Sequence, residues 1–280
     1  MTVTSQVAAA PVAPGAASHR VPSRRRLAHG WRALRTGVAF ASFGVGAIVV
    51  AAVTAVSARG ARERRELRTQ RVVHRAFRLF MWWMRCLRLC RVSWVGGERL
   101  RGTGPRLVVA NHPTLIDVIL LLARLPQADC IVKSAAQRNP FMRRIVTRAG
   151  YLANDDGDAL VESCAERIAQ GRSVLLFPEG TRSPRDGLRR FQRGAAHIAL
   201  KTGCPIVPVA ITCRPPTLLK GQAWHDVPDR RPEWVLRVGA PIDPARYLGA
   251  GSTLPVAARR LTADLQALYE QGLGANEEHS

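Results

Sequence analysis

At 280 residues, of which 47% are hydrophobic, the chain is long enough for one sizeable domain with an additional segment, and short for two full domains. Its formal net charge of +22 comes almost entirely from arginine and predicts anionic partners, either phosphate-bearing lipid or nucleic acid. The six cysteines form no C-x-x-C pair and have no histidines at zinc spacing, which argues against a zinc site and for reduced thiols in a cytosol-facing domain.

The amino-terminal part of the chain predicts a membrane-associated segment. Residues 1–35 are rich in Ala, Pro and Arg, and we expect them to be disordered. Residues 36–58 carry no charge and are long enough to cross about 30 Å of hydrocarbon as a helix; the alternative is a buried helix of a soluble protein. A cleaved signal peptide would have a shorter apolar stretch nearer the start. More arginines follow this segment than precede it, which favours a cytosolic main domain.

Residues 71–94 predict a second helix of the membrane-associated part. Val72, Ala76, Phe80 and Trp83 recur at three- and four-residue steps, while the arginines fall largely on the opposite arc. This pattern is typical of an amphipathic helix lying in the membrane interface, although a helix packed on the protein's own core has the same pattern. No zinc finger or RNP motif accompanies the basic residues, so we expect lipid and not nucleic acid as the partner.

From residue 95 onward, short β-branched apolar runs alternate with longer amphipathic runs. This alternation is typical of an α/β layered fold with a largely parallel sheet flanked by helices, in which the chemistry collects beyond the carboxyl ends of the strands. We expect residues 95–271 to form a catalytic domain and residues 272–280 to form a loose tail. The expected strands are 106–110, 128–133, 173–177, 205–211 and 233–238. The expected helices are 115–125, 139–150, 158–171, 189–203 and 255–271.

The sequence NHPTLID, residues 111–117, follows a predicted strand and contains a candidate catalytic pair. A histidine is suited to accept a proton near neutral pH, and a carboxylate bonded to Nδ1 would leave Nε2 free. Positions five apart in a regular helix diverge by about 140°, so His112 and Asp117 meet only if Pro113 and Thr114 form a turn. The motif contains no serine or cysteine, which favours a base acting on a bound acceptor over a covalent triad. The alternative is a structural histidine in a turn.

The sequence FPEGTRS, residues 177–183, follows another predicted strand. Glu179, Thr181 and Arg182 offer an acceptor, a hydroxyl and a bidentate cation on a tight loop opened by Gly180. Such a loop could hold a polar or phosphorylated headgroup. The alternative is an ordinary turn between a strand and a helix, with an exposed ion pair.

Taken together, in this order and at this separation, the two motifs resemble those of the glycerolipid acyltransferase family, which includes 1-acylglycerol-3-phosphate O-acyltransferase. The resemblance covers residues 95–215. The matching residues are Asn111, His112 and Asp117 in the first of the family's four sequence blocks, 177–183 in the third and 205–209 in the fourth. The resemblance implies a glycerol-3-phosphate acyltransferase-like fold, with residues 36–94 seating the enzyme on the membrane.

The resemblance also implies an activity, which is transfer of a fatty acyl group from acyl-CoA or acyl carrier protein to a lysophospholipid-like hydroxyl, without a metal or other cofactor. It implies that His112 takes the hydroxyl proton and that Asp117 orients His112. The residues expected to bind the acceptor are Glu179, Gly180, Thr181, Arg182 and Lys133. Membrane lipids are further expected partners, and the expected location is a bacterial inner membrane with the catalytic domain facing the cytoplasm.

The second block departs from the family's pattern, in which a glycine precedes an arginine that contacts the acceptor phosphate. Here the stretch is GYLANDDG, residues 150–157: Gly150 aligns, but the arginine position falls at or near Asp156. A carboxylate there would repel a phosphate. Either another cation substitutes, or the acceptor is a hydroxylated amphiphile other than lysophosphatidate, such as an amino-acid-derived lipid, selected by Asp155 and Asp156. These aspartates could instead only begin the following helix. The candidate substitute cations are Lys133, Arg143, Arg144 and Arg148.

Two other functions fit parts of the sequence. A thioester hydrolase could use the same base on water, although the acceptor-like loop FPEGTRS argues against it. A basic, membrane-tethered protein that binds nucleic acid or anionic lipid passively would need no catalytic histidine. The leading prediction is a membrane-bound O-acyltransferase.

Overall fold

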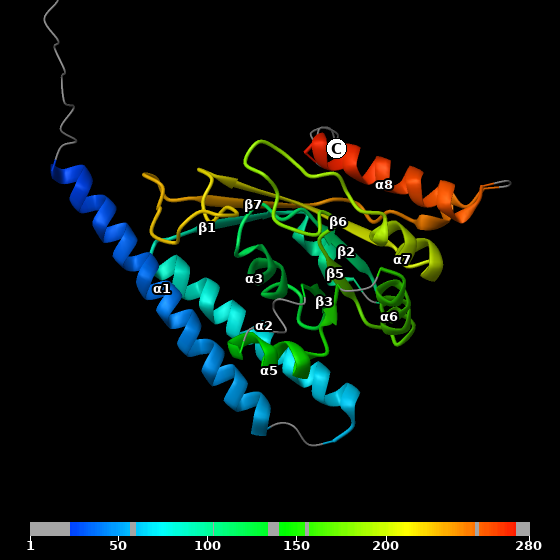
Figure 1. The fold of residues 1–280 in the computed structure, drawn as a ribbon, viewed down its shortest axis with the longest axis horizontal. Coiled ribbons are helices and arrows are strands. Elements are labelled where there is room, and N and C mark those ends of the chain that lie inside the picture. Colours follow the sequence, from blue (N-terminus) through cyan, green and yellow to red (C-terminus); the bar gives the residue numbers. More distant parts are fainter. Residues whose placement is uncertain are drawn as a thin grey trace, which may run out of the picture.

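The apolar, β-branched runs of the sequence pair into one seven-stranded sheet that helices cover on both faces (Figure 1). The computed structural model describes residues 23–56, 60–102, 104–133, 140–154, 157–249 and 252–272. The strand order is β1-β7-β6-β2-β5-β3-β4, in which β7 runs antiparallel to β6 and the other neighbours are parallel. The predicted α/β layered fold with a largely parallel sheet is confirmed.

The five predicted strands are confirmed as β2, β3, β5, β6 and β7, and two further strands, β1 and β4, were not predicted. The bounds are Arg91–Val95 for β1, Leu107–Ala110 for β2, Asp129–Val132 for β3, Leu152–Ala153 for β4, Val174–Leu176 for β5, Ile206–Arg214 for β6 and Glu233–Val238 for β7. Strand β2 is central and fully buried, because β5 and β6 pair with its two edges. The residues that follow β2 therefore lie at the middle of the sheet's carboxyl edge.

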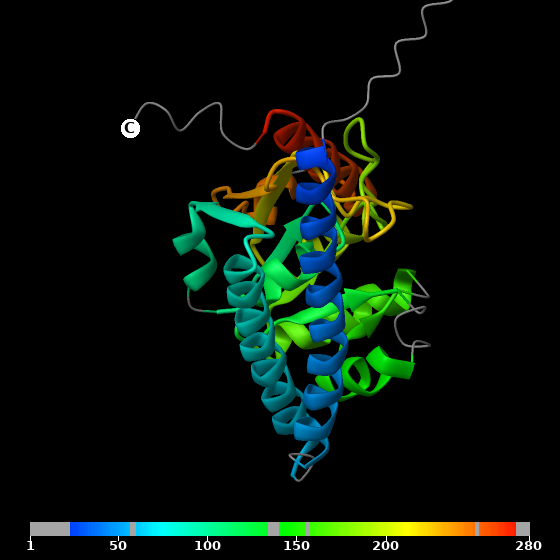
Figure 2. The same cartoon turned by 90° about the vertical axis from the view of Figure 1, so that its left-hand side faces the viewer.

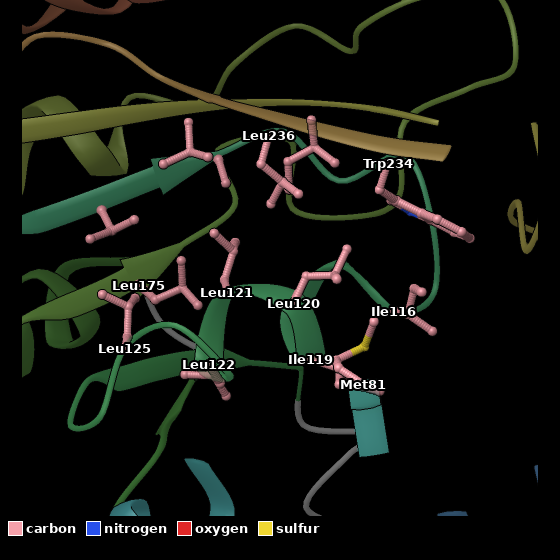
Figure 3. Close-up of a cluster of buried hydrophobic side chains, with 14 of the residues drawn as sticks. Met81, Ile116, Ile119, Leu120, Leu121, Leu122, Leu125, Leu175, Trp234 and Leu236 are labelled. Carbon is pink, nitrogen blue, oxygen red and sulfur yellow. The ribbon is translucent and has the colours of Figure 1, made fainter. Parts of the chain in front are cut away.

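The two faces of the sheet bury different helices. Alternate side chains of β2 point to opposite faces, so that Val108 packs with α2 and α3 while Leu107 and Val109 pack with α6, α7 and α8. Figure 3 shows the first of these cores, in which Leu120 and Leu121 of α3 lie beneath Leu236 of β7. The helix bounds are Asp117–Leu122 for α3, Pro140–Ala149 for α5, Gly157–Ala169 for α6, Gly194–Thr202 for α7 and Leu254–Glu270 for α8.

The first helix, α1, extends over Ser23–Val56 and lies beside α2, the two running in opposite directions (Figure 2). The prediction that residues 23–35 are disordered is therefore wrong. The first helical turns of α1 contact the folded domain, because Arg32 pairs with Asp229 at 3.2 Å and Gly37 lies against the ring of Trp224. Residues 1–22, the rest of the segment expected to be disordered, lie outside the described residues.

The second helix, α2, extends over Arg62–Cys86, so the prediction of a helix over 71–94 is wrong at both ends. Arg88, with a φ of 56°, turns the chain out of the helix, and the following residues form the edge strand β1. The inward face carries Val73, Met81 and Met84, whereas Leu79 is 63% exposed. Helix α2 thus packs on the protein's own core, which was the alternative interpretation of its amphipathic pattern.

A buried ionic network fastens α2 to the rest of the domain. Glu66, only 3% exposed, accepts hydrogen bonds from Arg167 of α6 at 2.5 Å and from Arg172 at 2.7 Å. Arg172 also donates to Asp129 of β3 at 2.5 Å. Gly150 lies directly over this carboxylate, because a Cβ there would come within 2.4 Å of Glu66. Burial alone would raise the pKa of Glu66, but the hydrogen bonds from its arginines lower it to about 2.

We expect Glu66→Gln to destabilise the protein. The change removes the carboxylate that pairs with Arg167 and one of the two that pair with Arg172, and breaking one side of a buried pair costs about 3 kcal/mol. The free energy of unfolding, measured with urea in detergent, should fall accordingly. Glu63→Gln, an exposed position on the same helix, is the matched control and should have little effect.

The difference between the wild type and Glu66→Gln should also depend on pH. Because the folded-state pKa is lowered from 4.5 to about 2, the carboxylate stabilises the protein fully above pH 4.5, and this contribution is lost as the pH falls toward 2. Urea unfolding at a series of pH values measures the difference. A difference that stays constant over this range would show that the charge of Glu66 does not stabilise the fold.

Candidate active site

Asn111 continues the central strand of the sheet beyond its last residue. Its side-chain amide donates to the carbonyl of Ile211 at 2.9 Å and accepts from the amide of Ile211 at 2.6 Å, in the manner of one more pair of sheet hydrogen bonds. The side chain is buried, so both its donor and its acceptor need these partners. Asn111 therefore fixes the position at which the chain leaves β2, and His112 follows directly.

His112 and Asp117 are in contact, as the sequence predicted. Nδ1 of His112 lies 2.9 Å from Oδ2 of Asp117. The turn that this contact requires is present, because α3 begins only at Asp117 and the residues after Pro113 are not yet helical. The imidazole stacks on the ring of Phe177, with 4.4 Å between the ring centroids. His112 is thus held on one side by a carboxylate and on its face by an aromatic ring.

Asp117 is completely buried and accepts hydrogen bonds on both of its oxygens. Thr114 donates from its backbone amide to Oδ2 at 2.6 Å and from its hydroxyl to Oδ1 at 2.5 Å. Burial raises the pKa of Asp117, and the hydrogen bonds from His112 and Thr114 act in the opposite direction. Since Asp117 occupies Nδ1, the nitrogen of His112 that is left for a substrate is Nε2.

Glu179, expected to bind an acceptor, is instead directed into the protein. It is 4% exposed, and its Oε1 accepts from the amide of His112 at 3.0 Å and from the hydroxyl of Ser183 at 2.6 Å. Its Oε2 accepts from the amide of Arg189 at 2.9 Å. In this structure Glu179 joins the end of β5 to the end of β2, and both of its carboxylate oxygens accept from groups of the protein.

Gly180, Thr181 and Arg182 of the FPEGTRS loop line a cavity beside His112, as does Phe177. Gly180, with a φ of 64°, turns the loop, while Thr181 and Arg182 are half-buried. Nη1 of Arg182 donates to the carbonyls of Leu218 and Leu219 at 3.1 and 3.0 Å, which fixes the guanidinium against the segment between β6 and β7. The structure therefore brings these three residues to the same site as the histidine.

The cavity has a volume of about 930 Å³ and extends from His112 to the helical pair α1 and α2. Phe43 of α1 and Phe77, Phe80 and Met84 of α2 supply much of its apolar wall. Lys133, which the sequence predicts as an acceptor ligand, also lines the cavity. In the part of the chain that the structure describes, no three His, Cys, Asp or Glu side chains are grouped so that they could hold a metal ion.

Of the predicted selectivity residues the structure describes Gly150, which does not line this cavity. Gly150 lies behind the site, buried against Glu66, so its lack of a side chain serves the ionic network and not the acceptor. Asp155 and Asp156 lie outside the described residues. Of the cations suggested as substitutes, Arg148 is committed elsewhere, since its Nη1 donates to the carbonyl of Ala51 in α1 at 2.7 Å.

Sequence reasoning missed two contributors to the site. Trp234 of β7 donates from Nε1 to the hydroxyl of Thr114 at 3.0 Å. Its place in a strand with alternating burial predicts that it faces the core, but not which atom it contacts. Leu218 accepts from the amide of Leu115 at 3.0 Å and so ties the segment between β6 and β7 to the histidine turn. No local pattern signals this contact, because Leu218 is distant in sequence from the turn.

Comparison with known proteins finds one matching family model and several similar proteins. Residues 75–212 match the family model described as Acyltransferase. A Helicobacter pylori 1-acyl-sn-glycerol-3-phosphate acyltransferase is 34% identical over 116 residues, which are 39% of this chain and 49% of the relative. A Pseudomonas aeruginosa lyso-ornithine lipid O-acyltransferase is 33% identical over 123 residues, which are 41% of this chain and 47% of the relative. This chain thus matches about half the length of these curated relatives.

A solved structure shares the fold. The crystal structure of the LPA acyltransferase PlsC from Thermotoga maritima superimposes with a TM-score of 0.56 and 21% sequence identity, over 88% of this chain and 98% of that chain. At this identity the likeness concerns the fold, including the layered sheet and the helices that cover it.

We expect Glu179→Gln to lower the stability of the protein. An amide has one acceptor oxygen in place of two, so at least one of the three donors bonded to Glu179 loses its partner in a buried place, at a cost of about 2 kcal/mol. Thermal or urea unfolding measures the loss, with the exposed Glu98→Gln as the control. A variant as stable as the wild type would show instead that Glu179 is available to a ligand.

Proposed function

We propose that this chain, whose residues 75–212 belong to the acyltransferase family, transfers a fatty acyl group from a thioester donor to a hydroxyl of a lysophospholipid-like acceptor. The observation that carries the proposal is the His112–Asp117 pair, which lies at the carboxyl end of the central strand and opens into the large apolar cavity. Acyl-CoA and acyl carrier protein are the proposed donors, and the chemistry requires no metal or other cofactor.

The proposed reaction follows from the arrangement of the pair. Nε2 of His112 removes the proton of the acceptor hydroxyl as the oxygen attacks the thioester carbonyl. The tetrahedral intermediate then expels the thiolate, which takes the proton from the imidazolium, so that an ester and a free thiol result. Asp117 holds the ring in place and stabilises the imidazolium while it exists. Alignment of the two substrates supplies much of the rate, as expected for a reaction without a covalent enzyme intermediate.

The wall of the cavity supports an acyl chain as its occupant. A volume of about 930 Å³ lies within the usual range of ligand sites, and the aromatic and aliphatic side chains of α1 and α2 suit a hydrocarbon chain. His112, Thr181 and Arg182 contribute polar groups to the lining of the same space. An acyl thioester placed with its chain against the helices would present its carbonyl to the acceptor hydroxyl near His112.

The charges around the cavity favour an anionic headgroup. Among the described residues that line it, Asp229 is the only carboxylate, and it already pairs with Arg32 at 3.2 Å. The lining cations are Arg32, Arg35, Arg88, Lys133, Arg182, Lys220, Arg230 and Arg231. These cations compensate for the arginine that the second sequence block lacks, so we propose a phosphate-bearing acceptor such as 1-acylglycerol-3-phosphate.

A second candidate acceptor is an amino-acid-derived lipid. Its support is the similarity to the lyso-ornithine lipid O-acyltransferase of Pseudomonas aeruginosa, together with the aspartates of the stretch GYLANDDG. Such a headgroup carries an amine, for which a carboxylate is the natural partner. The proposed activity is the same, and the two candidates differ only in the molecule that presents the hydroxyl.

We also propose that α1 seats the enzyme on the membrane by lying along its surface. Within the described chain one helical segment, Leu27–Val56, is long and apolar enough to cross a bilayer. However, Arg32 pairs with Asp229 near one end of α1, and Arg148 donates to the carbonyl of Ala51 near the other. A helix held to the same domain at both ends fits an interfacial position. The exposed apolar side chains of α1 are Leu27, Trp31, Leu34, Val38, Phe40, Val45, Ile48, Val49, Val53 and Val56.

The proposed location is the cytoplasmic face of a bacterial inner membrane. All six cysteines are free, as expected in a reducing compartment. The arginines that line the cavity would meet anionic headgroups of the same leaflet. In this position a membrane-resident acceptor reaches His112 without leaving the lipid surface.

We expect His112→Ala to abolish turnover without unfolding the protein. Loss of the general base should lower kcat/KM by about 10²- to 10⁴-fold, measured with purified enzyme in mixed micelles. Lipid mass spectrometry of cells carrying either form should show one product that only the wild type makes, and so identify donor chain and acceptor together. His197→Ala, on the opposite side of the sheet, is the control. Equal turnover by wild type and His112→Ala would reject the mechanism.

We expect Lys133→Gln to distinguish the two acceptors. Lys133 is exposed to solvent at the cavity, so its attraction for a phosphate is partly screened, and KM for lysophosphatidate should rise by about three- to tenfold with little change in kcat. Lys201→Gln on α7 is the control. If the acceptor is instead a lyso-ornithine lipid, the wild type converts that lipid in preference to lysophosphatidate, and the Lys133 substitution leaves its KM unchanged.

A further inference from the structure

A chain of hydrogen bonds, the relay, leads from Trp234 at the edge of the cavity through Thr114 to Asp117, the carboxylate behind His112. Nε1 of Trp234 lies 3.0 Å from the hydroxyl oxygen of Thr114, and this oxygen lies 2.5 Å from Oδ1 of Asp117. Asp117 in turn contacts Nδ1 of His112 at 2.9 Å. Trp234 comes from β7, whereas the other three residues belong to the turn after β2, so two distant parts of the sequence build the chain.

The three members behind His112 are shielded from water. Thr114 and Asp117 are completely buried and Trp234 is 1% exposed. Figure 3 shows the indole of Trp234 extending from β7 over the side of the core that holds Ile116 and Ile119, close to the start of α3. Because buried polar groups need partners within the protein, these groups depend on the three contacts and cannot exchange them for water.

The chemistry of the partners fixes the direction of every hydrogen bond. An indole N–H donates only, and an ionised carboxylate accepts only. The hydroxyl of Thr114 therefore accepts from Trp234 and must direct its own proton to Asp117. Asp117 receives a second proton from the amide of Thr114, at 2.6 Å. With two donors fixed in this way, the carboxylate presents an acceptor to His112, and His112 carries its proton on Nδ1.

We propose that Thr114 and Trp234 are positioning residues, which keep Asp117 ionised and hold His112 in the tautomer that leaves Nε2 free to act as a base. The proposal rests on the proposed acyl transfer, since it assigns to these residues the preparation of the base for that reaction. Neither residue touches the substrate hydroxyl through the atoms that form the relay. Both act through Asp117.

The relay has a consequence for pH dependence. Burial raises the pKa of Asp117, and the hydrogen bonds from His112 and Thr114 oppose the rise. The other charged or titratable groups nearby are Cys213 of β6 and Glu179, which accepts from the amide of His112. Removal of the Thr114 hydroxyl takes away one opposing contribution, so the pKa of Asp117 rises further. Asp117 then loses its charge at a higher pH, and the acid limb of the activity profile moves upward.

Substitutions at Thr114 test the relay with closely matched shapes. Thr114→Val removes the hydroxyl at nearly constant volume, whereas Thr114→Ser keeps it. Thr114→Val should lower kcat/KM by about 10- to 100-fold, the range for a hydrogen bond to a charged group, and move the acid limb to higher pH. Thr114→Ser should retain most of the activity and the wild-type profile. Thr202→Val on α7 controls for loss of a threonine hydroxyl that bonds to a helix carbonyl.

Trp234→Phe tests the far end of the relay. The variant keeps an aromatic ring and removes the N–H, so the Thr114 hydroxyl is free to rotate away from Asp117. We expect a smaller loss, of a few-fold in kcat/KM, with a shift of the acid limb in the same direction. Trp94→Phe on β1 is the matched control. This variant keeps the proposal testable if Thr114→Val fails to fold, which circular dichroism and thermal unfolding would reveal.

A readout that does not depend on turnover separates this proposal from the proposed function. ¹⁵N NMR of histidine-labelled protein reports the tautomer, and His112→Ala identifies the signal of His112. The wild type and Thr114→Ser should show a proton on Nδ1, and Thr114→Val should show a mixture of tautomers. If the wild type transfers no acyl group but the tautomer still changes, the proposed function fails and the relay stands. If Thr114→Val matches Thr114→Ser in pH profile and tautomer, the relay is wrong.

Discussion

A carboxylate without access to water must find hydrogen-bond donors inside the protein, and satisfying Asp117 determines the form of the whole site. Thr114 supplies two donors and His112 a third, which is possible only if the chain turns tightly between the end of β2 and the start of α3. The tight turn and the contact between His112 and Asp117 therefore depend on each other. A regular helix begun at His112 would carry Asp117 away from the imidazole and leave a buried charge unpaired.

A second buried carboxylate, Glu179, also needs hydrogen-bond donors inside the protein, and its hydrogen bonds join the remaining parts of the site. Glu179 accepts from the amide of His112, the hydroxyl of Ser183 and the amide of Arg189, so the loop after β5 cannot move independently of the turn after β2. Arg182 then ties that loop to the carbonyls of Leu218 and Leu219. Three segments far apart in sequence are thereby held around one histidine by charge-assisted hydrogen bonds, which are stronger than neutral ones.

The features that were predictable from the sequence are those that depend on local pattern. The five main strands followed from short apolar runs, and the contact of His112 with Asp117 followed from Pro113, which prevents an early helix. The role of Glu179 was not predictable, because whether a carboxylate faces a ligand or a backbone amide depends on what the fold brings beside it. The predicted bounds of α2, 71–94, were wrong for a similar reason, since the helix extends over Arg62–Cys86. Its inward face includes Glu66. A glutamate in a helix is expected to face solvent, but here Arg167 and Arg172, which are distant in sequence, pair with it inside the protein.

The position of His112 between two unlike environments bears on how one site could serve an amphiphilic reaction. Toward α1 and α2 the cavity is lined by Phe43, Phe77 and Phe80, where a hydrocarbon chain replaces water at a gain of about 0.8 kcal/mol per methylene. The loops after β3 and β5 contribute Lys133 and Arg182 to the same cavity, and these cations suit a headgroup. In the proposed acyl transfer the thioester carbonyl lies at the end of the acyl chain, so a chain seated against these aromatic rings would place the carbonyl near His112. Thr114, Asp117 and Trp234 behind the histidine are buried, whereas the side chain of His112 is 17% exposed, so the proposed base meets the cavity on one side and the dry interior on the other.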